Sequence, residues 1–226
     1  MRASAIDGGM FNLMVGFGET YLPAFVLAMG LGEISAGMVV SIPLLVGATL
    51  QLISPWAVGR LGSYRTWVTL CAATQGLAFL PLAGMAWSGA ATAWDSWQLF
   101  AAYAAASLYW GAGLAAGPAW NSWMETVIPL RVRSSFFAWR SRLGQAGLLV
   151  GFVGGGLLLD QARSRGAVLP MFAGIFLVAA LCRLVSARYL SRHSGRPMHS
   201  ESRVDVPFVE FVRRLWATGG ERFLLM

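Results

Sequence analysis

Six long apolar stretches, joined by short connections, account for most of this 226-residue sequence. Each is close to the roughly 20 residues that a helix needs to cross the hydrocarbon core of a bilayer. The chain is 57% hydrophobic and only 12% charged, whereas about a quarter of the residues of a soluble domain are charged. This composition argues against a soluble enzyme, a disordered chain or a collagen-like fibre. The sequence predicts an all-α, polytopic membrane protein.

Breaks in hydropathy give the expected organisation. Residues 1–190 are predicted to form a six-helix transmembrane bundle, 191–219 a cytoplasmic linker with a C-terminal amphipathic helix, and 220–226 the start of a truncated seventh helix. Pro55 is expected to end the second helix, and the long fourth helix is expected to tilt or break near Gly117-Pro118. The predicted transmembrane helices cover about 5–29, 34–56, 66–87, 97–124, 143–159 and 167–185.

Glycines of the fifth helix recur at steps of three and four residues, which places them on one helical face. Small residues on one face allow two helix backbones to approach closely, so this face is predicted to pack against another helix. The glycines are Gly144, Gly147, Gly151 and Gly155.

All 17 basic residues are arginines, and they are distributed unevenly among the connections. With the N-terminus in the cytoplasm, only Arg163 and Arg165 fall on the outer side, as expected if arginines stay in cytoplasmic loops. The arginines lie between apolar stretches and form no separate basic domain, so no nucleic-acid partner is expected. The sequence predicts a multi-pass protein of the plasma membrane with a cytoplasmic N-terminus.

Ionisable groups at membrane depth are costly, so Glu19 is the first candidate for function. It shares a helical stripe with Asn12, between small residues. Two interpretations stay open: Glu19 lines a pathway and binds a proton or a cationic group, or it is hydrated near the outer interface. Asp7, near the inner end, is interpreted as a solvated or capping acid.

Other polar and aromatic residues within the spans complete the candidate substrate and ion pathway. For Gln51 and Gln75, interhelical hydrogen bonding is the alternative to ligand contact. Trp110 lies in mid-span, where ordinary packing is the alternative. The full set of candidates is Asn12, Glu19, Gln51, Gln75, Trp110 and Asn121.

Catalysis finds little support in the sequence. Both histidines, His193 and His199, lie in the polar linker, and there is no zinc signature, nucleophile elbow or phosphate-binding loop. Cys71 and Cys182 lie inside apolar stretches and predict no disulfide. We expect no enzymatic activity, no metal and no cofactor.

The segment after the second helix resembles the loop signature of the major facilitator superfamily, Gly-x-x-x-Asp-Arg-x-Gly-Arg-Arg. Arg60 and Gly62 match it, and Arg65 supplies a basic residue one place late. Gly59 replaces the Asp that in the family helps to latch the two halves. The resemblance implies a gating loop at Gly59, Arg60, Gly62 and Arg65.

The connection between helices 4 and 5 is similar to that of a poorly characterised bacterial subgroup of these transporters. The resemblance rests on a Pro-x-Trp stretch at Pro118, followed by an acid and a basic-aromatic segment. It implies a bacterial inner membrane and two inverted three-helix repeats, the plan of the N-terminal half of the family. The residues assigned to this loop are Glu125, Arg131, Arg133 and Arg140.

The resemblance implies a secondary active transporter that moves a small solute, with protons as a candidate coupling ion, by alternating access. The chain would supply only the N-terminal half. Its partner would be a C-terminal six-helix half missing from the sequence, or a second copy if the protein is a dimerising half transporter. A non-transporting assembly or signalling subunit is the main alternative, and an intramembrane enzyme is a third. The sequence leaves the substrate, its direction of movement and the coupling ion open.

Overall fold

The computed structural model describes residues 2–89 and 96–192, together with Arg213. The chain divides into two compact units, Met1–Arg196 and Pro197–Met226, and α1 to α9 all belong to the first. The expected linker beyond residue 192, its amphipathic helix and the start of a seventh helix fall outside the described residues, except that Arg213 is helical and exposed.

The described part of the chain contains helices and no strands. In lipid, a helix satisfies its own backbone hydrogen bonds, which suits such apolar sequences. In chain order the elements are α1 (Arg2–Phe17), η1 (Glu19–Tyr21), α2 (Leu22–Ala28), α3 (Glu33–Leu50), η2 (Gln51–Ile53), α4 (Ser54–Leu61), α5 (Tyr64–Leu77), α6 (Phe79–Ser88), α7 (Ser96–Val127), α8 (Leu130–Ser164) and α9 (Val168–Ser191).

Six helical stretches of the described residues are long and apolar enough to cross a membrane, as predicted. Large apolar side chains such as Ile34, Leu45 and Leu157 are exposed on their outer faces. In water such a surface would be unfavourable, whereas against lipid tails it is not. The fold is therefore compatible with a multi-pass membrane protein. The stretches are Ser4–Ala28, Glu33–Leu61, Tyr64–Ser88, Trp97–Val127, Leu130–Ser164 and Val168–Ser191.

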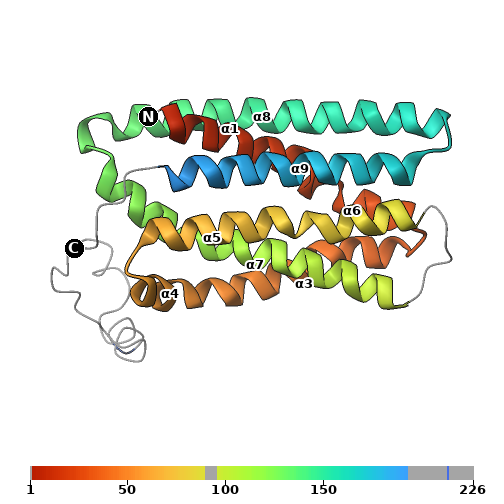
Figure 1. Ribbon diagram of the computed structural model, residues 1–226, viewed down its shortest axis with the longest axis horizontal. Helices are drawn as coiled ribbons and strands as arrows, with labels where there is room; N and C mark the ends of the chain where they lie inside the picture. The colour runs from red at the N-terminus through yellow and green to blue at the C-terminus, as the bar shows by residue number, and fades with distance from the viewer. Residues whose placement is uncertain (1, 90–95, 193–212, 214–226) are drawn as a thin grey trace. The chain divides into compact units, whose positions relative to one another are not determined.

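The main helix contacts join the first three spans to the last three. Helix α1 packs against α8 and α9, while α7 packs against α3 and α5, and α9 also contacts α5 and α6. Figure 1 shows the start of α1, the α4–α5 turn, the α7–α8 turn and the end of α9 at one end of this unit. The α2–α3 and α8–α9 turns lie at the opposite end.

Glycine allows the backbones of α1 and α8 to touch. A Cβ atom added to Gly16 would lie 2.4 Å from the carbonyl oxygen of Leu148 and 2.9 Å from the Cα of Gly151. These are backbone atoms, so the helices would have to move apart to admit a side chain. The predicted packing face of the fifth span is confirmed, and its partner is α1.

The second span continues past the proline that was expected to end it, so that prediction is wrong. A 3-10 turn at Gln51–Ile53 interrupts the span, and α4 then runs to Leu61. Pro55 lies in the first turn of α4, where its missing N–H has no intrahelical partner to lose. Gly62, with φ of +64°, caps the C-terminus of α4.

The assignment of Arg131, Arg133 and Arg140 to a loop is also wrong. Pro129 immediately precedes α8, and the helix then continues without a break through all three arginines. Glu125 likewise lies within α7, near its end. Hydropathy marks where a helix leaves the lipid, but a helix does not end there when its backbone bonds continue into the polar region.

Two further helix ends differ from expectation. Helix α9 extends to Ser191 and does not end near residue 185, so Ser186 lies on a buried face of this helix. Helix α7 is one continuous element across Gly117-Pro118, where a break was one of the two expectations. The first span, by contrast, is divided by a 3-10 turn that begins at Glu19.

Candidate functional site

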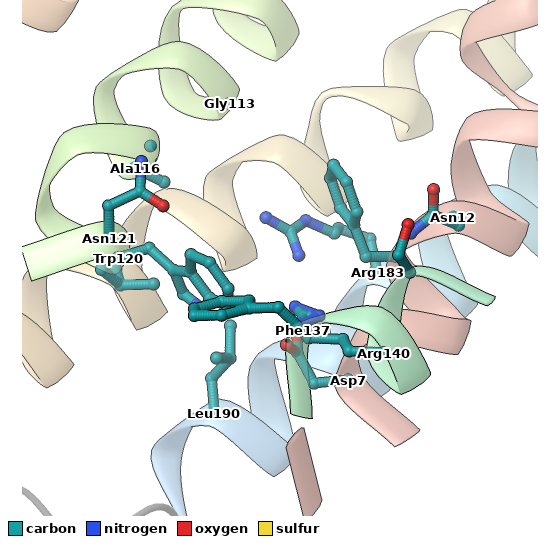
Figure 2. Close-up of a pocket in the computed structure, with 14 residues that line it drawn as sticks. Asp7, Asn12, Gly113, Ala116, Trp120, Asn121, Phe137, Arg140, Arg183 and Leu190 are labelled. Atoms are coloured by element: carbon teal, nitrogen blue, oxygen red, sulfur yellow. Dashed lines mark hydrogen bonds and ion pairs between the residues drawn. The ribbon is translucent and has the colours of Figure 1, made fainter. Parts of the chain in front are cut away.

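A cavity of about 340 Å³ lies among α1, α5, α7, α8 and α9. Figure 2 shows Trp120 and Asn121 of α7 on one side of it, and Asp7, Asn12 and Arg140 on the other. Arg140 is ten residues from the start of α8, about 15 Å along the helix. Arg140 and the cavity therefore lie in the half of the bundle nearer to the N-terminus.

In the cavity wall, an ion pair joins α1 and α8. Arg140 Nη2 donates to Asp7 Oδ2 at 2.7 Å, and the two side chains are 14% and 2% exposed. A buried charge is tolerated only when it is paired and hydrogen-bonded. Removal of either residue would therefore leave the charge of the other buried and unpaired.

Helix α9 joins this pair through Ser186. The Ser186 hydroxyl donates to Asp7 Oδ1 at 2.7 Å and accepts from Arg183 Nη1 at 2.7 Å. Arg183 Nε in turn donates to Gln75 Oε1 of α5 at 2.7 Å. The result is a continuous polar cluster, here called the Asp7 cluster, formed by Asp7, Gln75, Arg140, Arg183 and Ser186.

Aromatic rings lie against both guanidinium groups of the Asp7 cluster. The ring centroid of Trp120 is 4.5 Å from Arg140 Cζ, and that of Phe11 is 4.7 Å from Arg183 Cζ. Such contacts stabilise a cation electrostatically without neutralising its charge. Phe137 meets Trp120 edge to face and extends the aromatic wall.

A second, smaller polar group surrounds Glu19 in the turn that interrupts the first span. Tyr109 of α7 donates to Glu19 Oε2 at 2.5 Å, and its hydroxyl also lies 3.4 Å from Met14 Sδ. Tyr109 is fully buried, whereas Glu19 is half-buried. Glu19 does not line the cavity at the Asp7 cluster.

The structure brings together only part of the predicted site. Asn12, Asn121 and Arg140 line the cavity, and Gln75 contributes through Arg183. Gln51 lies in η2 and Trp110 packs against Tyr109, so neither they nor Glu19 reach the cavity.

The predicted loop residues lie elsewhere. Arg133 donates to the carbonyl oxygen of Glu125 at 2.8 Å across the α7–α8 turn, where Arg131 is exposed. The predicted gating-loop residues surround the α4–α5 connection. Gly59 and Arg60 are in the last turn of α4, Gly62 follows it, and Arg65 is in the first turn of α5.

Sequence reasoning missed three members of the Asp7 cluster. Asp7 is 1% exposed and ion-paired, so its interpretation as a solvated or capping acid is wrong. Arg183 and Ser186 were not considered. A signal for Arg183 was present, since an arginine inside the apolar stretch of α9 marks either a partner or a pathway.

Comparisons with known proteins give no match. No protein-family model, no curated protein and no solved structure matches this chain.

In the Asp7 cluster, one carboxylate interacts with two guanidinium groups. Arg140 binds one oxygen of Asp7 directly, and Arg183 reaches the other through Ser186. Four helices of the bundle, α1, α5, α8 and α9, meet in these contacts. A change of charge at any one member therefore alters the electrostatics of the other members of the cluster.

Proposed function

We propose that this chain forms one half of a secondary active transporter of the major facilitator type, which carries a small solute by alternating access. The observation that carries the proposal is the Asp7 cluster, a connected set of charged groups that lines a cavity inside a bundle of apolar helices. Ionisable groups at such depth usually mark a substrate or ion pathway.

The pattern of helix contacts supports two inverted three-helix repeats. If the first three spans are exchanged with the last three, the α1–α8 contact becomes the α7–α3 contact, and the α1–α9 contact becomes the α7–α5 contact. All four are among the main contacts of the bundle. Transporters built from inverted repeats have their binding sites between the repeats, and helices of both proposed repeats line the cavity of this chain.

The turns after the second span of each repeat agree with this exchange. Gly62 follows α4 with φ of +64°, and Gly166 follows α8 with φ of +67°. Glycine is the residue that adopts this backbone conformation without strain. A glycine with positive φ thus lies just after the second span of each proposed repeat.

The proposed orientation places the end with the N-terminus in the cytoplasm. Arg60, Arg65 and Arg188 lie at that end, and Arg163 and Arg165 lie at the other. This distribution favours a cytoplasmic N-terminus by the positive-inside rule. The cavity would then face the cytoplasm, with Glu19 deeper in the pathway as a proton-binding group.

A transporter of this kind needs a second wall for its pathway. We propose that a second six-helix bundle, either a C-terminal half or a second copy of this chain, supplies that wall. The exposed residues Asn121 and Ser141 at the rim of the cavity would then face the second bundle.

Thiol accessibility in proteoliposomes tests alternating access without knowledge of the substrate. In a background with Cys71→Ala and Cys182→Ala, a cysteine is placed at Asn121, and membrane-impermeant reagents are applied from each side. A transporter predicts that labelling at 121 changes when a proton gradient or a transported solute is supplied. The control is Ser88→Cys, an exposed position at the end of α6, at which no such change is expected.

Uptake into proteoliposomes that hold this chain together with its second six-helix bundle completes the test. A panel of labelled sugars, amino acids and organic acids is supplied with an imposed proton gradient. Saturable accumulation of any one of them supports the proposal. Labelling at 121 that does not respond to any condition, together with no uptake, would favour a non-transporting subunit.

A further inference from the structure

We propose that the cavity at the Asp7 cluster binds a small organic anion, with its acidic group against Arg140 and Arg183 and its apolar body against aromatic rings. This inference rests on the proposed function only for its consequence, transport. The binding itself is argued from charge, hydrogen bonding and the shape of the cavity.

The charges that line the cavity do not cancel. Among its described lining residues, Arg140 and Arg183 each carry a formal positive charge, and Asp7 carries the one formal negative charge. The formal sum is therefore +1. In a region of low dielectric constant an uncompensated cation is unfavourable, and a bound anion would compensate it.

The hydrogen bonds of the cluster leave N–H donors of the two guanidinium groups for a ligand. Both oxygens of Asp7 are occupied, one by Arg140 and one by Ser186. Arg140 Nε is buried and has no partner among the described residues. A guanidinium group offers five N–H donors in a planar fork, which matches a carboxylate or a phosphate.

The remaining walls define the rest of the ligand. Trp120 and Phe11 cover the two guanidinium groups, and Phe137 extends the aromatic surface. The volume of about 340 Å³ is at the lower end of the range of about 300–1,000 Å³ for small-molecule sites. A compact acid with an aromatic or branched apolar body fits both the charge and the surface.

Benzoate is a suitable probe, and benzylamine, which carries the opposite charge on the same ring, is its matched control. Thermal unfolding of the 226-residue chain in a neutral detergent is followed with a thiol-reactive dye, since Cys71 and Cys182 are buried and become reactive on unfolding. We expect benzoate to raise the midpoint temperature saturably and benzylamine to leave it unchanged. Equal responses to both probes, or a response to neither, would overturn the inference.

Two substitutions of opposite sign test the charge argument. Arg183→Gln lowers the formal charge of the cavity to zero and should weaken benzoate binding about tenfold or more. Asp7→Asn raises the charge to +2 and should strengthen binding, even though the variant itself unfolds at a lower temperature. A merely structural cluster predicts lower stability in both variants and no opposite change in affinity.

The control for the substitutions is Arg163→Gln. Arg163 is exposed in the last turn of α8, far from the cavity along the helix. Its removal should leave benzoate binding unchanged, and a tenfold loss there would show that binding follows overall charge and not the cavity. If Asp7→Asn does not fold, Arg140→Gln serves as a second variant that lowers the charge, with the same expected loss.

Anionic lipid is the other source of such an anion, and a further arm distinguishes it. If phosphatidylglycerol raises the midpoint temperature in an Arg183-dependent way and benzoate does not, the site binds lipid headgroups and the solute inference is wrong.

Measurements of uptake distinguish failure of this inference from failure of the proposed function. Benzoate binding without any uptake would refute transport and leave the site in place, whereas uptake of a neutral solute without benzoate binding would refute the site alone.

Discussion

The bundle contains two polar groups, the Asp7 cluster and the smaller group around Glu19. They differ in the number of side-chain hydrogen bonds that the carboxylate accepts. Both oxygens of Asp7 are hydrogen-bonded, to residues from two other helices, and its side chain is 2% exposed. Glu19 accepts one hydrogen bond, from Tyr109, and is half-buried. The carboxylate of Asp7, with two hydrogen-bond partners, is therefore expected to contribute more to stability than that of Glu19, with one.

The largest expected effect of this difference is at Asp7. Asp7→Asn removes the charge that Arg140 and Arg183 share, and breaking a buried ion pair from one side costs about 3–5 kcal/mol. We expect a loss of that size in the free energy of unfolding, measured by SDS titration in mixed micelles.

A double substitution sharpens the prediction at Asp7. Asp7→Asn combined with Arg140→Gln removes both members of the ion pair and leaves one buried cation, so it should cost less than the sum of the single substitutions. Additive losses would show that the two residues act independently, against the 2.7 Å contact between them.

The next largest loss of stability is expected on removal of a buried hydroxyl group. The Asp7 cluster contains that of Ser186, and the group around Glu19 contains that of Tyr109. Ser186→Ala should cost about 2–3 kcal/mol, because Ser186 is buried and its loss removes one hydrogen bond from each of two charged groups, Asp7 and Arg183. The same SDS titration measures this loss. A loss below that of Tyr109→Phe would contradict the view that the Asp7 cluster is the more constrained group.

Tyr109→Phe is the corresponding change at Glu19, with a smaller expected cost of about 1 kcal/mol. The side chain of Glu19 is half-buried, so water can replace the lost donor at its carboxylate. Near-native stability, together with the packing of the ring against Phe79 and Trp110, would be retained. A loss as large as that of Asp7→Asn would show that Glu19 depends on Tyr109 as strictly as Asp7 depends on its partners.

The sequence predicts the membrane-spanning helices better than it predicts where they end. The six apolar helices were predictable because hydropathy reports directly on transfer from water to lipid. The ends of these helices could not be predicted from hydropathy. A helix such as α8 extends beyond its apolar residues wherever its backbone hydrogen bonds continue. Pro129 was the local signal for where α8 begins.

The ion pair of the candidate site could not be read from one sequence. Asp7 and Arg140 are 133 residues apart, and only the folded bundle places them in contact. The position of Asp7 near the start of the first span suggested solvation. Arg183, in contrast, was recognisable, because it interrupts an apolar stretch in which an unpaired charge is not tolerated.

The smallest effect on stability, and the most informative for transport, is expected for Glu19→Gln. The amide oxygen still accepts from Tyr109, so the free energy of unfolding should change by less than about 1 kcal/mol. If Glu19 carries the coupling proton, the variant should exchange solute across the membrane but should not accumulate it against a gradient. The measurement compares exchange with gradient-driven uptake in proteoliposomes. Asp160→Asn, at an exposed acid of α8, is the matched control and should retain both activities. Accumulation by Glu19→Gln at the rate of the unmodified protein would remove Glu19 from the proton pathway and leave the Asp7 cluster as the remaining acidic candidate.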